Sequence, residues 1–452
     1  MLIRQINALW CDIDVDYINF VKPCLKYNKT IFIRKKFGGE KKTYDAYFMT
    51  GNRFLLGFTN RVFEFCLEKG EHPTIKYLMA NSVSKRMQKK IEPNLPGIIF
   101  RDDQKLLLDK MTTEKIGVIK SPTGSGKTVL ALGYLSQYPN ARAIFLCHNT
   151  SIIKQASKEA KKWGFDYGIC SKTLEEEDDT HPLTFASIQT FWKYPSKKID
   201  QYDIIIIDEA HHIASLSGMY GKTIVKMKKA VSRIGFTATL PEKKEQKFVL
   251  EGLMGPIIGE VTIQEGIKKG FLAKPKITLI SVPVRAYENA RTYKKNYELG
   301  IIKNRVRNHL IVQEAKKRIE DNKTVLIMVK EIEHGDNIKA IFDLFKIPNK
   351  FVQGKTNTTV REVLRTEFVK KRIKCVICTN VWREGIDITT LDVVINACGG
   401  KSEVQTLQTI GRGLRKTDKK STVEIIDFLD VNYYLSAHGI RRMAIYVEAG
   451  WL

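Results

Sequence analysis

The stretch that most constrains the fold is residues 121–128, Ser-Pro-Thr-Gly-Ser-Gly-Lys-Thr. It follows a short apolar run at 116–119 and precedes a helix-like run at 129–135. A glycine-rich turn between a strand and a helix, ending in Gly-Lys-Thr, is the setting of a phosphate-binding loop. Its backbone N–H groups and the helix N-terminus attract phosphate oxygens. The sequence therefore predicts a nucleotide-binding α/β domain.

Within this loop Lys127 can reach the β- and γ-phosphates, and the Thr128 hydroxyl can hold Mg²⁺. Serine stands at 121 where a glycine is usual, and its small side chain still fits. A chance Gly-Ser-Gly-Lys-Thr stretch is the alternative, and the flanking strand and helix argue against it. The residues expected to cradle the nucleotide are Pro122, Thr123, Gly124, Ser125, Gly126, Lys127 and Thr128.

A second strand ends in two carboxylates. Residues 204–207 are four isoleucines, and such a run without alternation predicts a strand buried on both faces of a parallel sheet. Asp208 follows and can hold Mg²⁺ through water, while Glu209 can orient or deprotonate the water that attacks the γ-phosphate. Adjacent acids also cap helices. Beside a phosphate loop, however, they favour ATP chemistry.

Length and charge bound the remaining choices. At 452 residues the chain should hold roughly three domains. The net charge of +26 indicates a polyanionic partner, most simply nucleic acid, although a basic surface kept for solubility is the alternative. No apolar run approaches the roughly 20 residues of a membrane span. Without a secretion signal, we expect a cytoplasmic protein, in the host cytoplasm if it is phage-encoded.

The eight cysteines are scattered, which fits free thiols in a reducing compartment. Cys375 and Cys378 have metal-site spacing, but they lie in an apolar run without a second pair. We therefore expect them to pack in the core.

Residues 1–95 carry no recognisable motif. Strand-like runs at 30–34 and 44–50, with Gly38-Gly39 between them as a turn, and helix-like runs at 60–68 and 74–90 predict a small α+β domain. Nucleic-acid contact and a plain solvated face are equally open interpretations of its basic clusters. These clusters are Lys35, Lys36, Lys41 and Lys42, then Lys85, Arg86, Lys89 and Lys90.

Taken in order, the motifs resemble those of superfamily 2 helicases and translocases, specifically the DEAH-bearing DNA motors. Arg101 and Gln104 resemble the adenine-reading Q motif, residues 208–211 (Asp-Glu-Ala-His) match motif II, and residues 408–415 (Gln-Thr-Ile-Gly-Arg-Gly-Leu-Arg) match motif VI. Two residues depart from the pattern. Asp103 stands where an aromatic is common, and His148 stands where proline is common.

The resemblance covers residues 96–452 and implies the architecture. It predicts two tandem RecA-like α/β domains with parallel sheets, at 96–273 and 274–452, preceded by the α+β accessory domain at 1–95. The compact layout is also similar to that of phage branch-migrating helicases of the UvsW type.

The resemblance also assigns roles. ATP would lie between the motor domains, with Lys127, Asp208 and Glu209 on the first. The second would supply Gln408 and two arginine fingers, whose planar guanidinium groups suit the γ-phosphate and are worth roughly 10³–10⁵ in rate. The fingers are Arg412 and Arg415; Gly385 and Asp387 would lie near the nucleotide; His148, Asn149, Thr150, Thr190, Lys330 and Thr379 would contact nucleic acid; His211, Thr237 and Thr239 would couple the sites. Simple turn capping is the alternative for the two threonines.

We therefore expect an ATP- and Mg²⁺-dependent DNA helicase or translocase that unwinds or branch-migrates forked and junction DNA in replication, recombination or repair. DNA would be bound mainly through its phosphates, and other replication or recombination proteins are further candidate partners. An RNA helicase stays open, because the motifs do not sense the 2′-OH. A motor subunit of a nuclease complex is a second alternative. A non-enzymatic, ATP-gated clamp is disfavoured because Glu209, Arg412 and Arg415 are all present.

Overall fold

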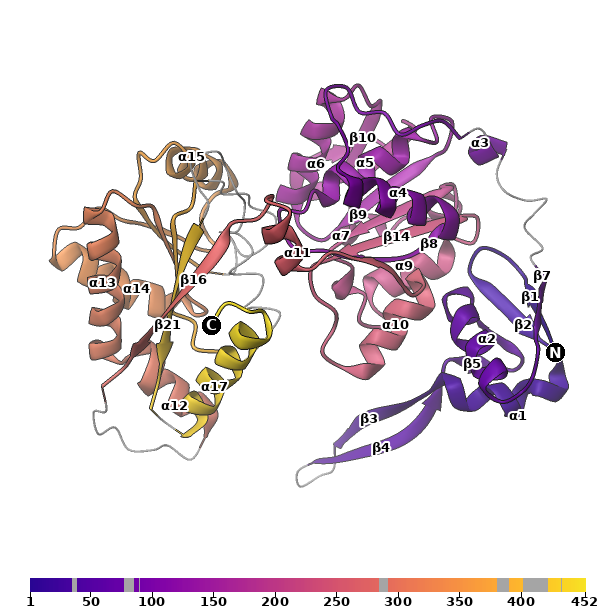
Figure 1. Ribbon diagram of the computed structural model, residues 1–452, viewed down its shortest axis with the longest axis horizontal. Helices are drawn as coiled ribbons and strands as arrows, with labels where there is room; N and C mark the ends of the chain where they lie inside the picture. Colours follow the sequence, from indigo (N-terminus) through magenta and orange to yellow (C-terminus); the bar gives the residue numbers. More distant parts are fainter. Residues whose placement is uncertain are drawn as a thin grey trace. The chain divides into compact units, whose positions relative to one another are not determined.

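The computed structural model describes residues 1–34, 39–76, 85–88, 90–283, 292–379, 390–400, 422–431 and 433–452. The chain divides into two compact units, which Figure 1 colours along the sequence. Unit 1 is Met1–Ser121 with Gly126–Glu260, and unit 2 is Pro122–Ser125 with Val261–Leu452. Unit 1 contains a small α+β domain and a large α/β domain, and unit 2 contains a second α/β domain. The expected fold class is confirmed.

The accessory domain is built on a five-stranded sheet in the order β5-β6-β2-β1-β7. The strands are β1 (Leu2–Gln5), β2 (Trp10–Ile13), β5 (Met49–Thr50), β6 (Arg53–Leu55) and β7 (Thr74–Lys76). Its helices are η1 (Val15–Tyr17), α1 (Ile18–Val21), η2 (Lys22–Leu25), η3 (Leu56–Phe58) and α2 (Thr59–Glu68). The short helix α3 (Lys85–Gln88) lies against the first motor domain, where Arg86 pairs with Asp203 at 3.0 Å (Figure 1).

The helix expected over 74–90 is wrong at its start. Thr74–Lys76 instead forms the edge strand β7, which pairs in parallel with β1. Three residues are too few to show a period, so pairing with a distant strand decides their conformation. The helical run at 60–68 is confirmed by α2.

A separate two-stranded ribbon comprises β3 (Lys26–Arg34) and β4 (Gly39–Tyr47). The two strands are longer than the expected runs at 30–34 and 44–50, and Gly39 is already the first residue of β4 rather than part of a turn. Gly38 lies outside the described residues.

The first motor domain contains an eight-stranded sheet in the order β11-β10-β12-β9-β13-β14-β8-β15. All its described pairings are parallel except that of β10 with β11. The strands are β8 (Ile116–Lys120), β9 (Ala143–Cys147), β10 (Tyr167–Ser171), β11 (Glu176–Glu177), β12 (Leu183–Ser187), β13 (Ile204–Asp208), β14 (Ser232–Thr237) and β15 (Ile257–Glu260). The isoleucines of β13 are fully buried, as their run predicts.

The helices of this domain are α4 (Asp102–Glu114), α5 (Lys127–Ser136), α6 (Thr150–Lys162), η5 (Lys172–Leu174), α7 (Ile188–Phe191), α8 (Ser196–Ile199), η6 (Ala210–His212), α9 (Met219–Lys226) and α10 (Lys244–Met254). Two local features differ from what the sequence predicts. The acidic run at 175–179, which by composition is a solvated loop, contains the edge strand β11. Residues 184–190 are predicted as a short strand with a polar end, but β12 stops at Ser187 and α7 begins at once.

Unit 2 contains a six-stranded parallel sheet in the order β16-β21-β20-β17-β19-β18. The strands are β16 (Lys274–Ser281), β17 (Val325–Met328), β18 (Lys350–Val352), β19 (Cys375–Cys378), β20 (Val393–Asn396) and β21 (Thr422–Leu429). The helices are α11 (Ile263–Lys268), α12 (Tyr293–Tyr297), η7 (Glu298–Ile302), α13 (Arg305–Glu320), α14 (Ile332–Leu344), α15 (Thr358–Val369) and α17 (Tyr433–Glu448). Within the described ranges, no helix is long and apolar enough to cross a membrane.

The cysteine predictions are confirmed. All eight thiols are free, and Cys375 and Cys378 are fully buried in β19. The Cys378 Sγ lies 3.2 Å from the Met328 Sδ on the neighbouring strand.

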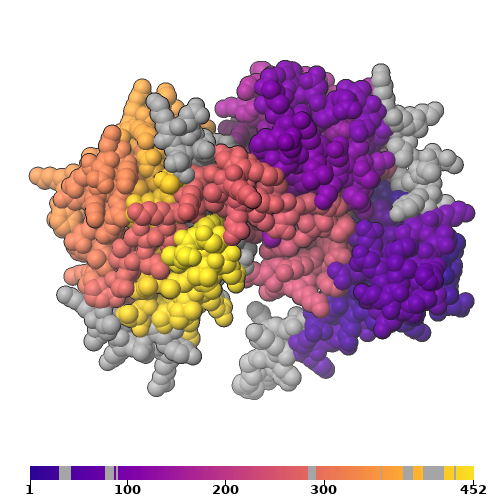
Figure 2. Space-filling view, in the orientation of Figure 1, coloured from indigo at the N-terminus to yellow at the C-terminus, as the bar shows by residue number. Residues whose placement is uncertain are grey.

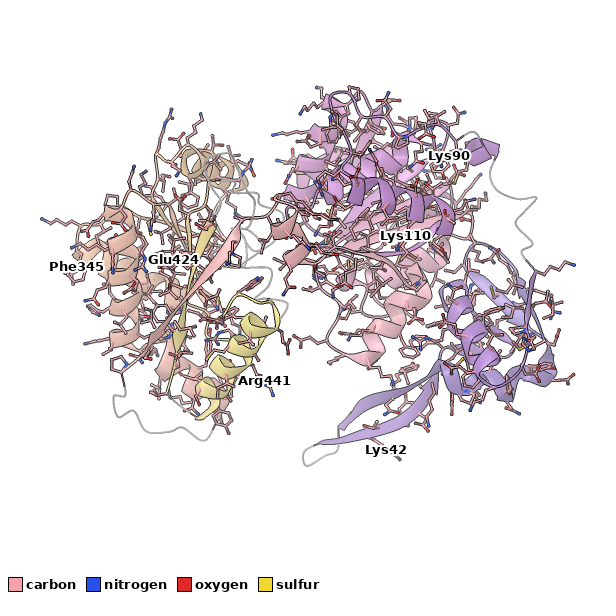
Figure 3. All side chains as sticks on the ribbon, viewed as in Figure 1. Lys42, Lys90, Lys110, Phe345, Glu424 and Arg441 are labelled. Atoms are coloured by element: carbon pink, nitrogen blue, oxygen red, sulfur yellow. The ribbon has the colours of Figure 1, made fainter. Side chains whose placement is uncertain are left out.

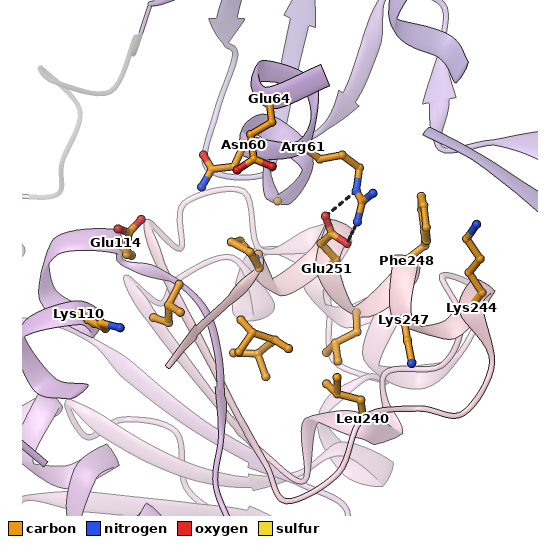
Figure 4. A pocket seen from close by; sticks show the side chains of 17 residues that line it. Asn60, Arg61, Glu64, Lys110, Glu114, Leu240, Lys244, Lys247, Phe248 and Glu251 are labelled. Carbon is orange, nitrogen blue, oxygen red and sulfur yellow. Dashed lines mark hydrogen bonds and ion pairs between the residues drawn. The ribbon is translucent and has the colours of Figure 1, made fainter. Parts of the chain in front are cut away.

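The accessory domain locks onto α10 of the first motor domain. A Cβ added to Gly57 would lie 2.0 Å from the Glu251 carbonyl oxygen, so the backbones meet where no side chain fits. Arg61 donates to both oxygens of Glu251 at 2.8 and 2.7 Å, beside a cavity of about 690 Å³ (Figure 4). Figure 2 shows the indigo atoms of the accessory domain directly against the pink atoms of the first motor domain.

This close approach predicts that Gly57→Ala destabilises the docked accessory domain by about 1–3 kcal/mol, since overpacking forces backbone shifts. The first transition in urea-induced unfolding of the full chain measures the effect. Gly354→Ala is the control, because nothing lies within 4 Å of a Cβ at Gly354. Equal stability of the two variants would contradict the close backbone contact between the accessory domain and α10.

Candidate active site

The carboxyl end of β14 lies between the two parts of the site, the phosphate loop and the acidic pair Asp208 and Glu209. Because β14 lies between β8 and β13, Thr237 sits between the phosphate loop and the acidic pair. The Ser121 N–H donates to the Thr237 carbonyl oxygen at 2.8 Å. The Thr237 hydroxyl donates to the Thr239 carbonyl oxygen at 2.6 Å and lies 3.0 Å from the His211 Nδ1. Its single proton is thus used, and the geometry assigns the donor in the second contact to His211.

The phosphate loop connects β8 to α5, as the sequence predicts. Gly124 and Gly126 have φ angles of +88° and +94°, which only glycine adopts readily. A Cβ on Gly126 would also lie 2.6 Å from the Gln104 Nε2. The start of α4 therefore lies against the loop, and the predicted adenine-reading residue is close to the phosphate-binding backbone.

Arg101, the other residue of the expected Q motif, is held by Asp103. Its Nε and Nη2 donate to the two carboxylate oxygens of Asp103 at 3.1 and 3.0 Å. The Gln104 Oε1 accepts from the Arg101 N–H at 3.2 Å. In the sequence, Asp103 was notable only because an aromatic residue is common at this position of the family's Q motif. Its structural role is to fix the guanidinium beside the nucleotide-binding loop.

Lys127 and Asp208 form the charged centre. The Lys127 Nζ is buried and has no hydrogen-bond partner in the described part of the chain. Burial raises the pKa of Asp208 to about 6, with the positive charge of Lys127 opposing the shift and the negative charge of Glu209 adding to it. A buried ammonium without a partner is costly. The pair therefore fits a polyphosphate with its Mg²⁺ ion, for which Thr128 and Asp208 supply hard oxygen ligands.

Glu209 has a left-handed backbone, with φ 53° and ψ 51°. For a residue other than glycine this conformation costs of order 1–3 kcal/mol. The Glu209 N–H donates to the Asp208 Oδ1 at 3.0 Å, and its Oε2 lies 3.4 Å from the His211 Nδ1. Strain is thus stored at the carboxylate expected to handle the attacking water.

Three histidine rings lie beside the acidic pair. The His148 and His212 centroids are 3.9 Å apart, and those of His211 and His212 are 4.3 Å apart. The His148 carbonyl oxygen accepts from the Gln189 Nε2 at 2.9 Å. His212 and Gln189 were not singled out in the sequence. The one sequence signal for His212 was the second of two consecutive histidines after Asp-Glu-Ala.

The residues expected to contact nucleic acid have varied settings. The Asn149 Oδ1 accepts from the Ser151 N–H at 2.9 Å and so caps α6, which begins at Thr150. The Thr190 hydroxyl is buried and accepts from the Lys172 N–H at 3.0 Å. This geometry gives Thr190 a structural task and does not favour a phosphate contact.

In unit 2, Lys330 is exposed at the end of β17, with its Nζ 5.2 Å from the centroid of the Tyr297 ring. Thr379 follows β19 and is 7% exposed. Five further site residues lie outside the described residues: Gly385, Asp387, Gln408, Arg412 and Arg415.

Family models match both motor domains. Residues 81–242 match the model described as Type III restriction enzyme, res subunit, and residues 304–417 match the Helicase conserved C-terminal domain. The second match includes all five site residues that the structure does not describe.

Curated relatives agree with this assignment. The ATP-dependent DNA helicase UvsW of Enterobacteria phage T4 is 26% identical over 373 residues, covering 73% of this chain and 72% of UvsW. The DNA 3′-5′ translocase XPB2 of Sulfurisphaera tokodaii is 27% identical over 379 residues, covering 75% and 84%. The chain spans only 63% and 51% of the length of two other relatives.

Solved structures share the fold. A fragment of an HsdR subunit from Vibrio vulnificus superposes with a TM-score of 0.56 at 18% identity, covering 91% of this chain and 76% of the fragment. Dbp5 of S. cerevisiae, bound to RNA and ADP BeF3, also gives 0.56 at 16% identity, covering 78% and 88%.

The bidentate ion pair between Arg101 and Asp103 yields a prediction. Asp103→Ala should raise the KM for ATP by roughly three- to tenfold, since losing a charge-assisted bidentate pair releases the guanidinium. The kcat should change little. Steady-state hydrolysis measures both constants, with Asp102→Ala as the control because the Asp102 side chain is solvent-exposed. An unchanged KM in Asp103→Ala would contradict the positioning role.

Proposed function

The chain belongs to superfamily 2 of the helicases, and on that premise we propose an ATP-dependent DNA helicase or translocase that unwinds or branch-migrates forked and junction DNA. One observation carries the proposal. A strained Glu209 and a buried Lys127 ammonium, which has no hydrogen-bond partner among the described residues, flank the end of β14, where Thr237 contacts Ser121 at the start of the loop and His211 beside the acidic pair. This constellation suits hydrolysis of a nucleoside triphosphate whose energy is passed to another part of the chain.

The residues of the first motor domain divide the chemistry among them. Lys127 neutralises charge on the phosphates, and Glu209 orients or deprotonates the attacking water. Mg²⁺, when bound, would be held by Thr128 and Asp208 and would neutralise charge on the phosphate oxygens. Gln104 and Arg101 hold the adenine side.

The second motor domain would complete the site. Arg412 and Arg415 are proposed as fingers that stabilise the negative charge developing on the γ-phosphate, with Gln408 beside them. Gly385 and Asp387 are proposed to approach the nucleotide. Charge stabilisation would then require domain closure, and opening after hydrolysis would move one set of strand contacts relative to the other.

DNA is favoured over RNA because UvsW and XPB2 are described as a DNA helicase and a DNA translocase. The likeness to Dbp5 concerns the fold alone. The restriction-enzyme model favours the motor-subunit alternative as the second candidate. In the described ranges there is no group of three or more His, Cys, Asp or Glu side chains that could hold a metal ion.

Glu209→Gln tests the hydrolytic role. We expect DNA-stimulated ATP hydrolysis to fall by roughly 10²–10⁴-fold, because general-base catalysis is lost. ATP affinity should stay within a few-fold. Glu175→Gln is a matched control, since Glu175 is an exposed glutamate with a similarly left-handed φ of 56°. Normal hydrolysis by Glu209→Gln would remove Glu209 from its role.

Thr237→Val tests the connection between the site and motion. Losing the hydroxyl removes the contact with His211, so unwinding per ATP hydrolysed should fall at least fivefold, the lower range of typical coupling energies. ATP hydrolysis itself should stay within a few-fold. Thr223→Val is the control, because the Thr223 hydroxyl is also buried and donates only within its own helix. Parallel loss of both activities would instead indicate a plain structural role for Thr237.

A further inference from the structure

The β3–β4 ribbon stands apart from both sheets of unit 1. It forms a sheet of its own, with Lys26–Arg34 paired against Gly39–Tyr47 along its whole length. Nine residues per strand give a length of about 30 Å at roughly 3.3 Å per residue. Figure 1 shows it extending as a narrow ribbon. Because an isolated hairpin is marginally stable in water, an element of this kind needs an anchor.

Aromatic stacking anchors the ribbon at its base. Tyr27 stacks on Phe48 with centroids 4.3 Å apart, and Phe48 stacks on Phe248 of α10 at 6.0 Å. Phe58 lies 5.6 Å from Phe48 and 5.9 Å from Phe248. These contacts tie the ribbon to the first motor domain, so it moves together with that domain.

The ribbon is strongly basic. Residues 26–47 include seven lysines and arginines against two acidic residues. The pairing register places Lys29 opposite Tyr44, and Lys42 lies two residues before Tyr44 on the same strand. All three side chains therefore share one face. Each is exposed, and the Lys29 Nζ lies 5.9 Å from the centroid of the Tyr44 ring.

Of the two acidic residues of β4, Glu40 stands two residues before Lys42, and Asp45 does not neutralise this face. By register Asp45 lies on the opposite face, where its Oδ2 is 2.8 Å from the Lys26 Nζ. Lys29, Tyr44 and Lys42, which we call the lysine–tyrosine face, thus present two ammonium groups and a phenol to solvent. Figure 3 shows Lys42 on the outer part of the ribbon.

We propose that the lysine–tyrosine face binds the phosphate backbone of a DNA duplex. Lysine and tyrosine are ordinary phosphate ligands, and the major groove, about 12 Å wide, admits a two-stranded ribbon. A duplex carries one negative charge per roughly 1.7 Å, which complements a basic ribbon about 30 Å long. The inference rests on the proposed function, in which DNA is the substrate. It makes the accessory domain hold a duplex arm while the motor domains act on a strand.

A double variant tests the proposal. Lys29→Ala with Lys42→Ala should lower the slope of log affinity against log salt by about 1.8, because each phosphate contact contributes about 0.9. Affinity for a fluorescent duplex of about 30 base pairs should fall roughly tenfold near 0.1 M salt. Binding is measured on the full chain by anisotropy.

Two controls accompany it. Lys69→Ala with Lys76→Ala removes the same charge from exposed positions elsewhere in the accessory domain and should leave the slope nearly unchanged. Lys29→Arg with Lys42→Arg should keep the wild-type slope. ATP hydrolysis stimulated by single-stranded DNA should be retained by every variant, which shows that the motor is folded.

The outcomes separate the two proposals. Wild-type affinity and slope in the alanine variant, with DNA-stimulated hydrolysis intact, would overturn the duplex-binding face alone. An equal loss in the Lys69/Lys76 control would also overturn it, because the effect would then be one of net charge. Loss of an acidic protein partner or of self-association without loss of DNA binding would overturn it in favour of a protein interface. Absence of DNA-stimulated hydrolysis in the wild type would instead overturn the proposed function.

Discussion

The buried strand β13 is the constraint on which the site depends. Its four isoleucines are covered on both faces, so the strand can lie only in the middle of the sheet. Asp208 at its end is thereby carried to the edge where β8 delivers the phosphate loop. The intervening β14 ends in Thr237, which contacts both sides. The burial of β13 within the sheet therefore sets the spacing between the phosphate loop and the acidic pair.

Features that cost folding free energy are concentrated where these elements meet. Asp208 is buried enough for its pKa to rise to about 6, the Lys127 ammonium lacks a hydrogen-bond partner in the described structure, and Glu209 is held in a left-handed conformation. Each feature opposes folding, and in the proposed function each is relieved or used when a polyphosphate binds. Their concentration at one edge of the sheet distinguishes this site from the buried Arg442–Asp427 pair of unit 2, in which the guanidinium donates to both carboxylate oxygens.

Much of this arrangement was predictable from the sequence, because the strongest signals are local. The isoleucine run, the glycines of the loop and the order of motifs predicted the parallel sheets and the acidic pair. Pairing with a distant strand produces β7. Neither the ion pair of Asp103 with Arg101 nor the packing of the His212 ring against His148 and His211 leaves a periodic pattern in the sequence. No sequence signal predicts the left-handed backbone of Glu209, because glycine is the residue type from which that conformation is predicted. Likewise, the face shared by Lys29, Tyr44 and Lys42 follows from a strand register that sequence alone leaves open.

The central claim is that ATP hydrolysis at this site drives motion along DNA. Its most direct test measures steady-state ATP hydrolysis by the wild-type chain on DNA tracts of increasing length, at saturating numbers of binding sites. A translocase takes more steps per encounter on longer tracts, so the hydrolysis rate should rise with length and then level off. A rate that is stimulated by DNA yet independent of tract length would contradict the claim.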